Sequence, residues 1–166
     1  FECFTINRID QVSSTTGINA VAKFSFEYSA NCWLKGVHSF SCNGAHVRLA
    51  YSAHNFVTDC YFDDAFAYGG GGQAYGVNLL LASSECRIEN NIFENLRHSM
   101  LVHYGANANV FAYNYSFNTR DEFGSGSEDL VCHGNYPYLN LFEGNVADWG
   151  AVDDAAGANG PYNTYF

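Results

Sequence analysis

The sequence is poor in positive charge: seven Lys and Arg stand against seventeen Asp and Glu among 166 residues, for a net charge of −10. No basic stripe could displace counterions from phosphates, which argues against nucleic-acid binding and attachment to an anionic membrane. No apolar run approaches the ~20 residues that span a bilayer, so we expect no membrane insertion. No signal peptide opens the chain, and because it begins with Phe1 rather than Met, we expect an internal piece of a longer protein.

Proline and methionine are also scarce, with two and one residues, whereas Gly (16) and Asn (18) are abundant. The best candidate for a helix, residues 93–98, is long enough for one turn only. Hydrophobic residues make up 48% of the chain, which excludes general disorder. They form short β-branched and aromatic clusters separated by Asn, Gly and Ser, a pattern that predicts an all-β domain of many short strands.

Five segments of the chain align as a repeat. They begin at residues 32, 55, 86, 109 and 140, so the intervals alternate between 23 and 31, and extension gives further starts at 1 and 163. This period, built from strands, predicts a parallel β-solenoid in which each coil lies ~4.8 Å from the next. The third repeat position is apolar almost throughout and should form an inward stack: Cys3, Leu34, Val57, Ile88, Phe111, Phe142 and Tyr165.

The sixth repeat position becomes Asn in the later coils, at Asn91, Asn114 and Asn145. We expect these side chains to be buried and to hydrogen-bond one another as an amide ladder. A second strand should precede each repeat start, at residues 21–26, 45–49, 77–81, 100–103 and 130–133.

The longer coils carry extra residues in equivalent places, at 13–17, 65–76 and 118–129. Their Gly, Ser and polar content predicts loops. All three should protrude from one side on every second coil, so that the loops at 65–76 and 118–129 lie ~10 Å apart along the axis. The loops would then form a ridged wall that borders a cleft.

Several runs of residues carry a resemblance to known proteins. They are Asn-Cys-Trp-Leu-Lys-Gly-Val (31–37), Asp-Asp-Ala-Phe-Ala-Tyr followed by four glycines (63–72), Leu-Arg-His-Ser-Met (96–100), His-Gly-Asn-Tyr-Pro (133–137) and Asn-Gly-Pro-Tyr-Asn-Thr (159–164). Together they resemble a group of large secreted bacterial proteins with a pectate-lyase-like right-handed β-helix, many of which resemble cargo of the type IX secretion route. The resemblance covers nearly the whole chain.

The resemblance implies an all-β, right-handed parallel β-helix of about six to seven coils. Residues 1–166 would form a single segment without its natural flanks. It also implies a secreted or cell-surface location, with the secretion machinery and a polysaccharide or another cell-surface component as partners. It implies no particular reaction, because the β-helix carries both enzymes and inert scaffolds.

Six cysteines are present, and no Cys-x-x-Cys pair indicates a zinc or thioredoxin-like motif. Cys3, Cys32, Cys60 and Cys86 fall on repeat positions, where a small apolar side chain suits the stack. We expect buried free thiols, with one disulfide between neighbouring coils as the alternative.

Polysaccharide lyases of this fold neutralise a uronate carboxylate, remove the C5 proton with a base and protonate the leaving oxygen. The candidate catalytic residues for these steps are Asp63, Asp64, Arg97, His98 and His133, which we expect to face the gap between the two loops. Calcium is the one cofactor considered, with Asp63–Asp64 and Asp153–Asp154 as oxygen ligands. Solvated turn residues are the alternative interpretation of these acidic pairs.

Three other features bear on a site. His103 and His133 are 30 residues apart rather than 31, so a one-residue shift in register would turn one of them into the core. The glycines at 69–72 lack the Lys-Ser/Thr of a phosphate loop and predict a bent loop over the wall. Several tyrosines could stack on sugar rings or fill the coils: Tyr68, Tyr75, Tyr104, Tyr136, Tyr138 and Tyr162.

Two functions remain open from the sequence. The first is a carbohydrate-directed role, with polysaccharide binding and lyase or hydrolase cleavage; the second is a non-catalytic structural or adhesive module exported by a type IX-like route. Pectate cleavage is not predicted, because neither Pro137 nor Pro161 has an adjacent Arg and no dense Asp cluster is present. The net charge of −10 would repel anionic uronates unless calcium intervenes.

Overall fold

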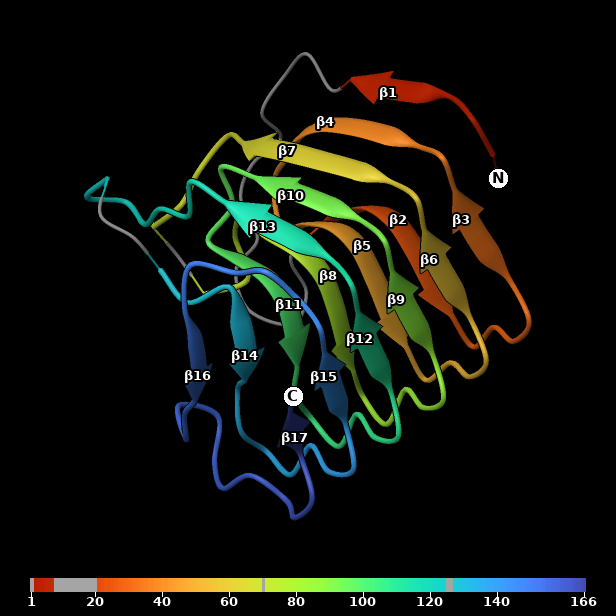
Figure 1. Ribbon diagram of the computed structural model, residues 1–166, viewed down its shortest axis with the longest axis vertical. Coiled ribbons are helices and arrows are strands. Elements are labelled where there is room, and N and C mark those ends of the chain that lie inside the picture. Colours follow the sequence, from red (N-terminus) through yellow and green to blue (C-terminus); the bar gives the residue numbers. More distant parts are fainter. Residues whose placement is uncertain (1, 8–20, 70, 125–126) are drawn as a thin grey trace.

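A computed structural model describes residues 2–7, 21–69, 71–124 and 127–166, so the predicted loop at 13–17 lies outside the described residues. The described chain winds through three parallel sheets, and each coil adds one strand to each sheet (Figure 1). We call the sheets A, B and C. The predicted all-β parallel solenoid is confirmed.

Sheet A contains the strands that open each repeat: β3 (Trp33–Lys35), β6 (Phe56–Thr58), β9 (Arg87–Glu89), β12 (Val110–Ala112), β15 (Leu141–Glu143) and β17 (Thr164–Tyr165). Sheet B contains β1 (Thr5–Asn7), β4 (His38–Cys42), β7 (Tyr61–Ala65), β10 (Ile92–Glu94) and β13 (Tyr115–Phe117). Sheet C contains β2 (Ala22–Glu27), β5 (Ala45–Ala50), β8 (Tyr75–Leu80), β11 (His98–Val102), β14 (Leu130–Cys132) and β16 (Gly150–Val152).

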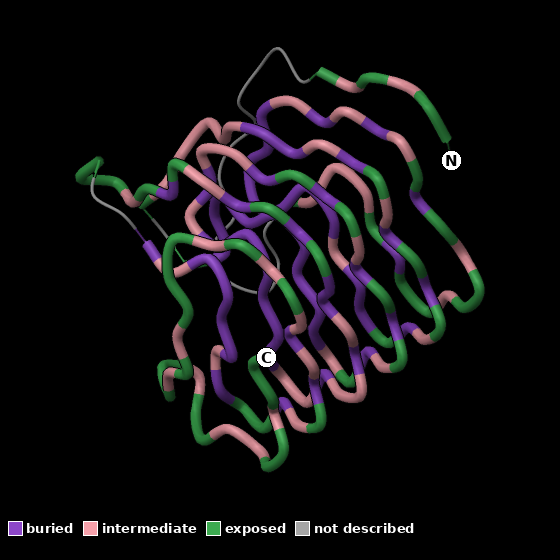
Figure 2. The backbone as a smooth tube through the Cα atoms, in the orientation of Figure 1, coloured by how far each residue is buried: buried purple, intermediate pink, exposed green. Residues whose placement is uncertain are grey.

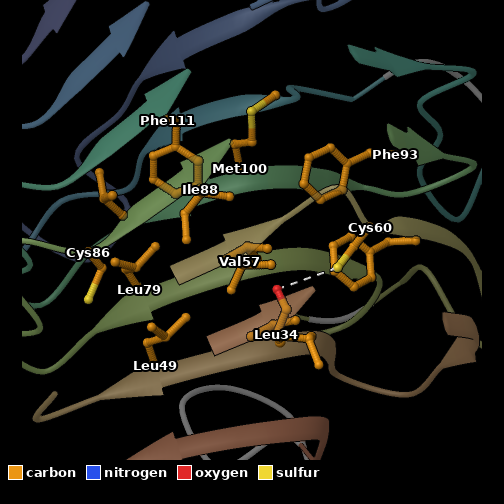
Figure 3. Close-up of a cluster of buried hydrophobic side chains, with 14 of the residues drawn as sticks. Leu34, Leu49, Val57, Cys60, Leu79, Cys86, Ile88, Phe93, Met100 and Phe111 are labelled. Carbon is orange, nitrogen blue, oxygen red and sulfur yellow. Dashed lines mark hydrogen bonds between the residues drawn. The ribbon is translucent and has the colours of Figure 1, made fainter. Parts of the chain in front are cut away.

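The predicted inward stack runs through sheet A in the predicted register. Each member pairs with the next along Leu34, Val57, Ile88, Phe111, Phe142 and Tyr165. The rings of Phe111 and Phe142 stack with centroids 5.1 Å apart. Figure 3 shows these side chains gathered in the core, and Figure 2 shows the alternation of buried and exposed residues along the strands. Tyr165, on the edge strand β17, is 40% exposed.

Sheet B is a third strand per coil that the sequence analysis did not predict. Residues 93–98, considered there as a helical turn, belong to β10 and the start of β11. In β10 the side chains of Ile92 and Glu94 face outward while Phe93 is fully buried, which is the alternation of a half-buried strand. Three residues are too few for that alternation to be recognised in the sequence.

The asparagine ladder is present at the sixth repeat position. The Asn91 side-chain amide donates to Asn114 Oδ1 at 3.0 Å, and that of Asn114 donates to Asn145 Oδ1 at 2.9 Å. Each amide oxygen also accepts a backbone N–H from the preceding coil, as in Asn91 N–H to Asn114 Oδ1 at 3.0 Å. Asn91 and Asn114 are buried as predicted, whereas Asn145 is half-buried.

A second ladder of the same kind follows the first repeat position. It was not predicted, although Asn at four of the repeat starts is its signal in the sequence. Asn109 donates to Asn140 Oδ1 at 3.0 Å, and Asn140 donates to Asn163 Oδ1 at 2.9 Å. Both ladders therefore satisfy backbone groups at the two ends of the sheet A strands.

Replacing Asn114 should destabilise the fold, because Asn114→Ala leaves the buried Asn91 N–H and the Ile88 carbonyl without their partner. We expect the free energy of unfolding to fall by ~2–4 kcal/mol, since each unsatisfied buried polar group costs ~1–3 kcal/mol. Urea denaturation followed by circular dichroism measures the loss. The matched control is Asn7→Ala on the exposed surface, and equal losses in the two variants would contradict a stabilising ladder.

The corners between sheets are made by residues with positive φ. One such column contains non-glycine residues with φ between 52° and 63°: Asn31, His54, Glu85, Ala108, Leu139 and Tyr162. A left-handed conformation costs these L-residues ~1–2 kcal/mol each. Because backbone hydrogen bonds join the column from coil to coil, as from Asn31 N–H to the Ala53 carbonyl, the conformation is imposed by the stacking of the coils.

The corner between sheets B and C varies most in length. Two residues (43–44) join β4 to β5 and three (95–97) join β10 to β11, but nine (66–74) join β7 to β8 and twelve (118–129) join β13 to β14. Both described long loops therefore lie at one corner on alternate coils, as expected. Their bounds differ slightly, because Ala65 and Tyr75 belong to strands.

All six cysteines are free thiols, so the alternative of a disulfide between coils is not present. Cys60 and Cys86 are buried as predicted, and burial raises the pKa of the Cys60 thiol to about 11. Cys32 is half-buried. Cys3 is exposed, contrary to the prediction, because it lies on the first described coil and packs against one neighbouring coil only.

Candidate acid–base site

The outer surface of sheet C is buried, which is unusual for the outside of a solenoid. Tyr75, Leu101 and Val131 pack there in a hydrophobic cluster separate from the main core. In the same sheet, Val77 and Met100 point to the opposite side, into the main core. Functional side chains on the outer surface of sheet C are therefore shielded from water.

Three polar side chains follow the ends of consecutive sheet C strands. The backbone N–H groups of His103, His133 and Asp153 each donate to a residue of the neighbouring coil, at 3.1, 2.9 and 3.0 Å. Because Val102 pairs with Cys132, the spacing of 30 residues keeps His103 and His133 in register on the same surface, and neither enters the core. The centroids of their rings are 6.0 Å apart.

His133 and Asp153 form a hydrogen-bonded pair, with 2.7 Å between His133 Nδ1 and Asp153 Oδ2. An ionised carboxylate can only accept a hydrogen bond, so the proton of the imidazole resides on Nδ1. The Nε2 atom of His133 then carries a lone pair and can act as a base, as in other His–Asp pairs.

His98 and His103 are buried and neutral. Burial, the dominant cause, lowers the pKa of His98 to about 4 and that of His103 to about 3. Arg48 further lowers the pKa of His103 through its positive charge, which places the guanidinium near the imidazole. The His98 ring lies 5.8 Å from that of His133, and its Nδ1 contacts the Glu128 carbonyl at 2.7 Å.

Several buried polar atoms on this surface have no hydrogen-bond partner within the structure described. They are His98 Nε2, both ring nitrogens of His103, Arg48 Nε and Asn78 Oδ1. Arg48 and Asn78 occupy paired positions on neighbouring strands of sheet C. Unsatisfied buried groups are rare in native proteins, and a cluster of them indicates a surface that binds a polar ligand.

A cavity of about 220 Å³ adjoins these side chains, lined by Gly71, Gly72, Tyr75, His103, Tyr104, His133, Ala155 and Ala156. The Tyr75 hydroxyl accepts a hydrogen bond from the Gly72 N–H at 2.9 Å, so the glycine loop covers the cavity. Burial raises the pKa of Tyr75, while the nearby guanidinium of Arg97 lowers it. The tyrosine therefore stays protonated and can donate a proton to a ligand.

The fold and this geometry can be compared with known proteins. The family described as Right handed beta helix region matches residues 3–136. The chain belongs to this right-handed β-helix family. Neither a curated protein nor a solved structure matches the chain. In the described part of the β-helix, no helix is long and apolar enough to cross a membrane.

The β-helix brings together three of the five predicted site residues. His98 and His133 lie side by side, and Arg97 lies next to His98 with its guanidinium near Tyr75. Asp63 and Asp64 are not part of this cluster. Asp63 Oδ2 contacts His38 Nε2 at 3.3 Å on the outer surface of sheet B, and the Asp64 carbonyl contacts His46.

The prediction that all five residues face one gap is therefore wrong. The acidic pair was read as part of a loop, whereas it belongs to β7. The loops at 66–74 and 118–129 also contact each other directly, because Arg120 lies 4.0 Å above the ring centroid of Tyr68. The hollow between them is lined by other residues: Phe66, Ala67, Tyr68, Arg120, Asp121, Glu122 and Gly124.

Asp153 was considered only as a calcium ligand, but in the β-helix it orients His133. No group of three or more His, Cys, Asp or Glu side chains in the described residues is arranged to hold a metal ion. Asp154 lies in a turn, where its carbonyl accepts the Gly157 N–H at 2.8 Å. The roles of Arg48 and Asn78 were missed, because only the register of sheet C places them beside His103.

Proposed function

We propose that this β-helix binds an acidic polysaccharide and cleaves it by β-elimination in the cavity beside His133. One observation carries the proposal: His133 and Asp153 form a 2.7 Å acid–base pair at a cavity that also holds the protonated Tyr75 hydroxyl. The unsatisfied polar atoms around the cavity support a polar ligand.

The reaction needs a base, an acid and a positive charge. His133 Nε2 takes the C5 proton of a uronate residue, the C4–O bond breaks, and a C4=C5 double bond forms. The leaving oxygen takes a proton from the Tyr75 hydroxyl. Arg97, near Tyr75, neutralises the uronate carboxylate and so favours loss of the C5 proton. Asp153 stabilises the imidazolium that forms on His133.

Elimination fits these residues better than hydrolysis does. Glycosidases place two carboxyl groups on opposite sides of the scissile bond. The residues lining the cavity include no carboxylate, and Asp153 is hydrogen-bonded to His133. Asp63 lies on sheet B, where it contacts His38 instead.

The test is incubation of the purified chain with a panel of uronate polysaccharides, following unsaturated products by ultraviolet absorbance. We expect His133→Gln to lower the rate ~10²–10⁴-fold, the usual contribution of a general base. Asp153→Asn should lower it less, through loss of orientation. The matched control is His54→Gln, whose side chain is 53% exposed outside the cavity. No product from any substrate, or equal rates in His133→Gln and the wild type, would refute the proposal.

A non-catalytic adhesive or structural module is the second candidate. Its support is the outer surface of sheet A, where Trp33 (51% exposed) and Phe56 (39%) lie on neighbouring strands. Retention of polysaccharide without any product in the same panel would favour it. For either function we propose a secreted or cell-surface location and export by type IX-like machinery, which the resemblance of the sequence supports.

A further inference from the structure

We infer that the cavity holds a single sugar residue at the reducing end of a chain, and that the preceding residues run outward along Tyr51 and Tyr28. The inference rests on the proposed elimination and specifies its mode: cleavage from the chain end, with an unsaturated monosaccharide as the product.

The size and walls of the cavity carry the first step. Its volume is about 220 Å³, below the ~300–1,000 Å³ of pockets that enclose a drug-sized ligand. Gly71 and Gly72 line it from the loop after β7, and Ala155 and Ala156 line it from the turn after β16. A site enclosed by two such segments suits one pyranose ring, whereas an open groove would suit the middle of a chain.

The position of the base decides which residue enters. In a β-elimination on a 1→4-linked chain, the residue that loses its C5 proton also carries the new double bond. His133 lines the cavity, so the enclosed residue is the one that becomes unsaturated. Because a single enclosed residue is a chain end, it is the reducing end, and the rest of the chain lies outside the cavity.

A row of side chains leads away from the cavity along the solenoid axis. Tyr104 lines the cavity, and its carbonyl accepts the Ala82 N–H of the preceding coil at 2.9 Å. The Leu81 carbonyl in turn accepts the Tyr51 N–H at 3.1 Å. The rings of Tyr51 and Tyr28 stack 5.0 Å apart, and they are 50% and 78% exposed.

A shallow hollow of about 480 Å³ runs beside these tyrosines. Three serines supply hydroxyl groups to it: Ser29, Ser52 and Ser84. Exposed aromatic rings with hydroxyl groups beside them match the apolar faces and hydroxyl groups of sugars. Successive coils are ~4.8 Å apart, so the row from Tyr104 to Tyr28 spans about three sugar residues.

The size of the first products tests the inference. The wild-type chain is incubated with the polysaccharide that it cleaves, and products are separated by size with ultraviolet detection. We expect an unsaturated monosaccharide from the earliest times and a slow fall in viscosity. Reduction of the chain ends with borohydride should slow the reaction at least ~10-fold, because an open-chain alditol no longer fits the cavity.

A second arm tests the row of tyrosines. Tyr51→Ala should raise KM several-fold for tetramers and longer chains, with a smaller change for the dimer. Tyr115→Ala, an equally exposed tyrosine on sheet B (47%), is the matched control. A ladder of unsaturated oligosaccharides, or full activity on reduced chains, would overturn the chain-end mode and leave the proposed elimination intact. The absence of all unsaturated products would overturn both.

Discussion

The substitution Phe111→Ala should lower the free energy of unfolding by ~3–5 kcal/mol, the range measured for buried Phe. Phe111 is fully buried at the middle of the inward stack, paired with Ile88 on one side and Phe142 on the other. A solenoid coil contacts only its two neighbours, so the cavity left behind weakens both interfaces of that coil. Closure of the cavity would require the strands of several coils to shift together.

Urea denaturation of the wild type and the variant at neutral pH measures the effect. Phe56→Ala, on the same sheet, is the matched control, because its side chain is 39% exposed and points outward. We expect the control to lose about 1 kcal/mol or less, as surface substitutions usually do. A loss below about 1 kcal/mol for Phe111→Ala would show that this column is not the core.

Acid should destabilise the β-helix through His46, which lies inside the solenoid. Its Nδ1 accepts the Ser39 hydroxyl at 2.8 Å, and its Nε2–H donates to the Asp64 carbonyl at 3.2 Å. Burial, together with the positive charge of Lys23, lowers the pKa of His46 to about 3. The unfolded chain, with an ordinary histidine pKa of ~6.5, therefore binds the proton more readily than the folded chain does.

Stability should fall as pH falls from ~6.5 towards the folded pKa, because protons then favour the unfolded state. At pH 4.5 the contribution of His46 is roughly 3 kcal/mol, at 1.36 kcal/mol for each pH unit below the unfolded value. Carboxylates titrate in the same range, so the difference between variants isolates the histidine. His46→Gln should lose less stability between pH 7 and pH 4.5 than the wild type or the exposed control His54→Gln. Parallel losses in all three proteins would contradict a buried, neutral His46.

The inward stack and the asparagine ladder could be predicted because they depend on one quantity, the repeat interval. Once Leu34, Val57 and Ile88 align, every residue at the same repeat position falls into one column. Sheet B escaped notice for the opposite reason. Its strands β10 and β13 have three residues each, and β7 carries the Asp63–Asp64 pair that also suits a turn.

The candidate site was only partly predictable. His98 and His133 were identified by their residue type, but their neighbours depend on details of the corners between strands. The spacing of 30 residues from His103 to His133 departs from the repeat, and Asp153 follows after 20 more. Only the pairing of β11, β14 and β16 shows that these three residues share one surface.

The variable corner between sheets B and C bears on how such proteins diversify. The ladders of sheet A continue unbroken whether that corner holds two residues (43–44) or nine (66–74). The entropy of closing a flexible loop rises by only about 1 kcal/mol over that range of lengths. Insertions and deletions there are nearly neutral for folding, yet they reshape the walls of the cavity. Substrate preference can therefore drift by changes in loop length while the scaffold keeps its sequence constraints, and grafting new loops at this corner is the natural route to redesign.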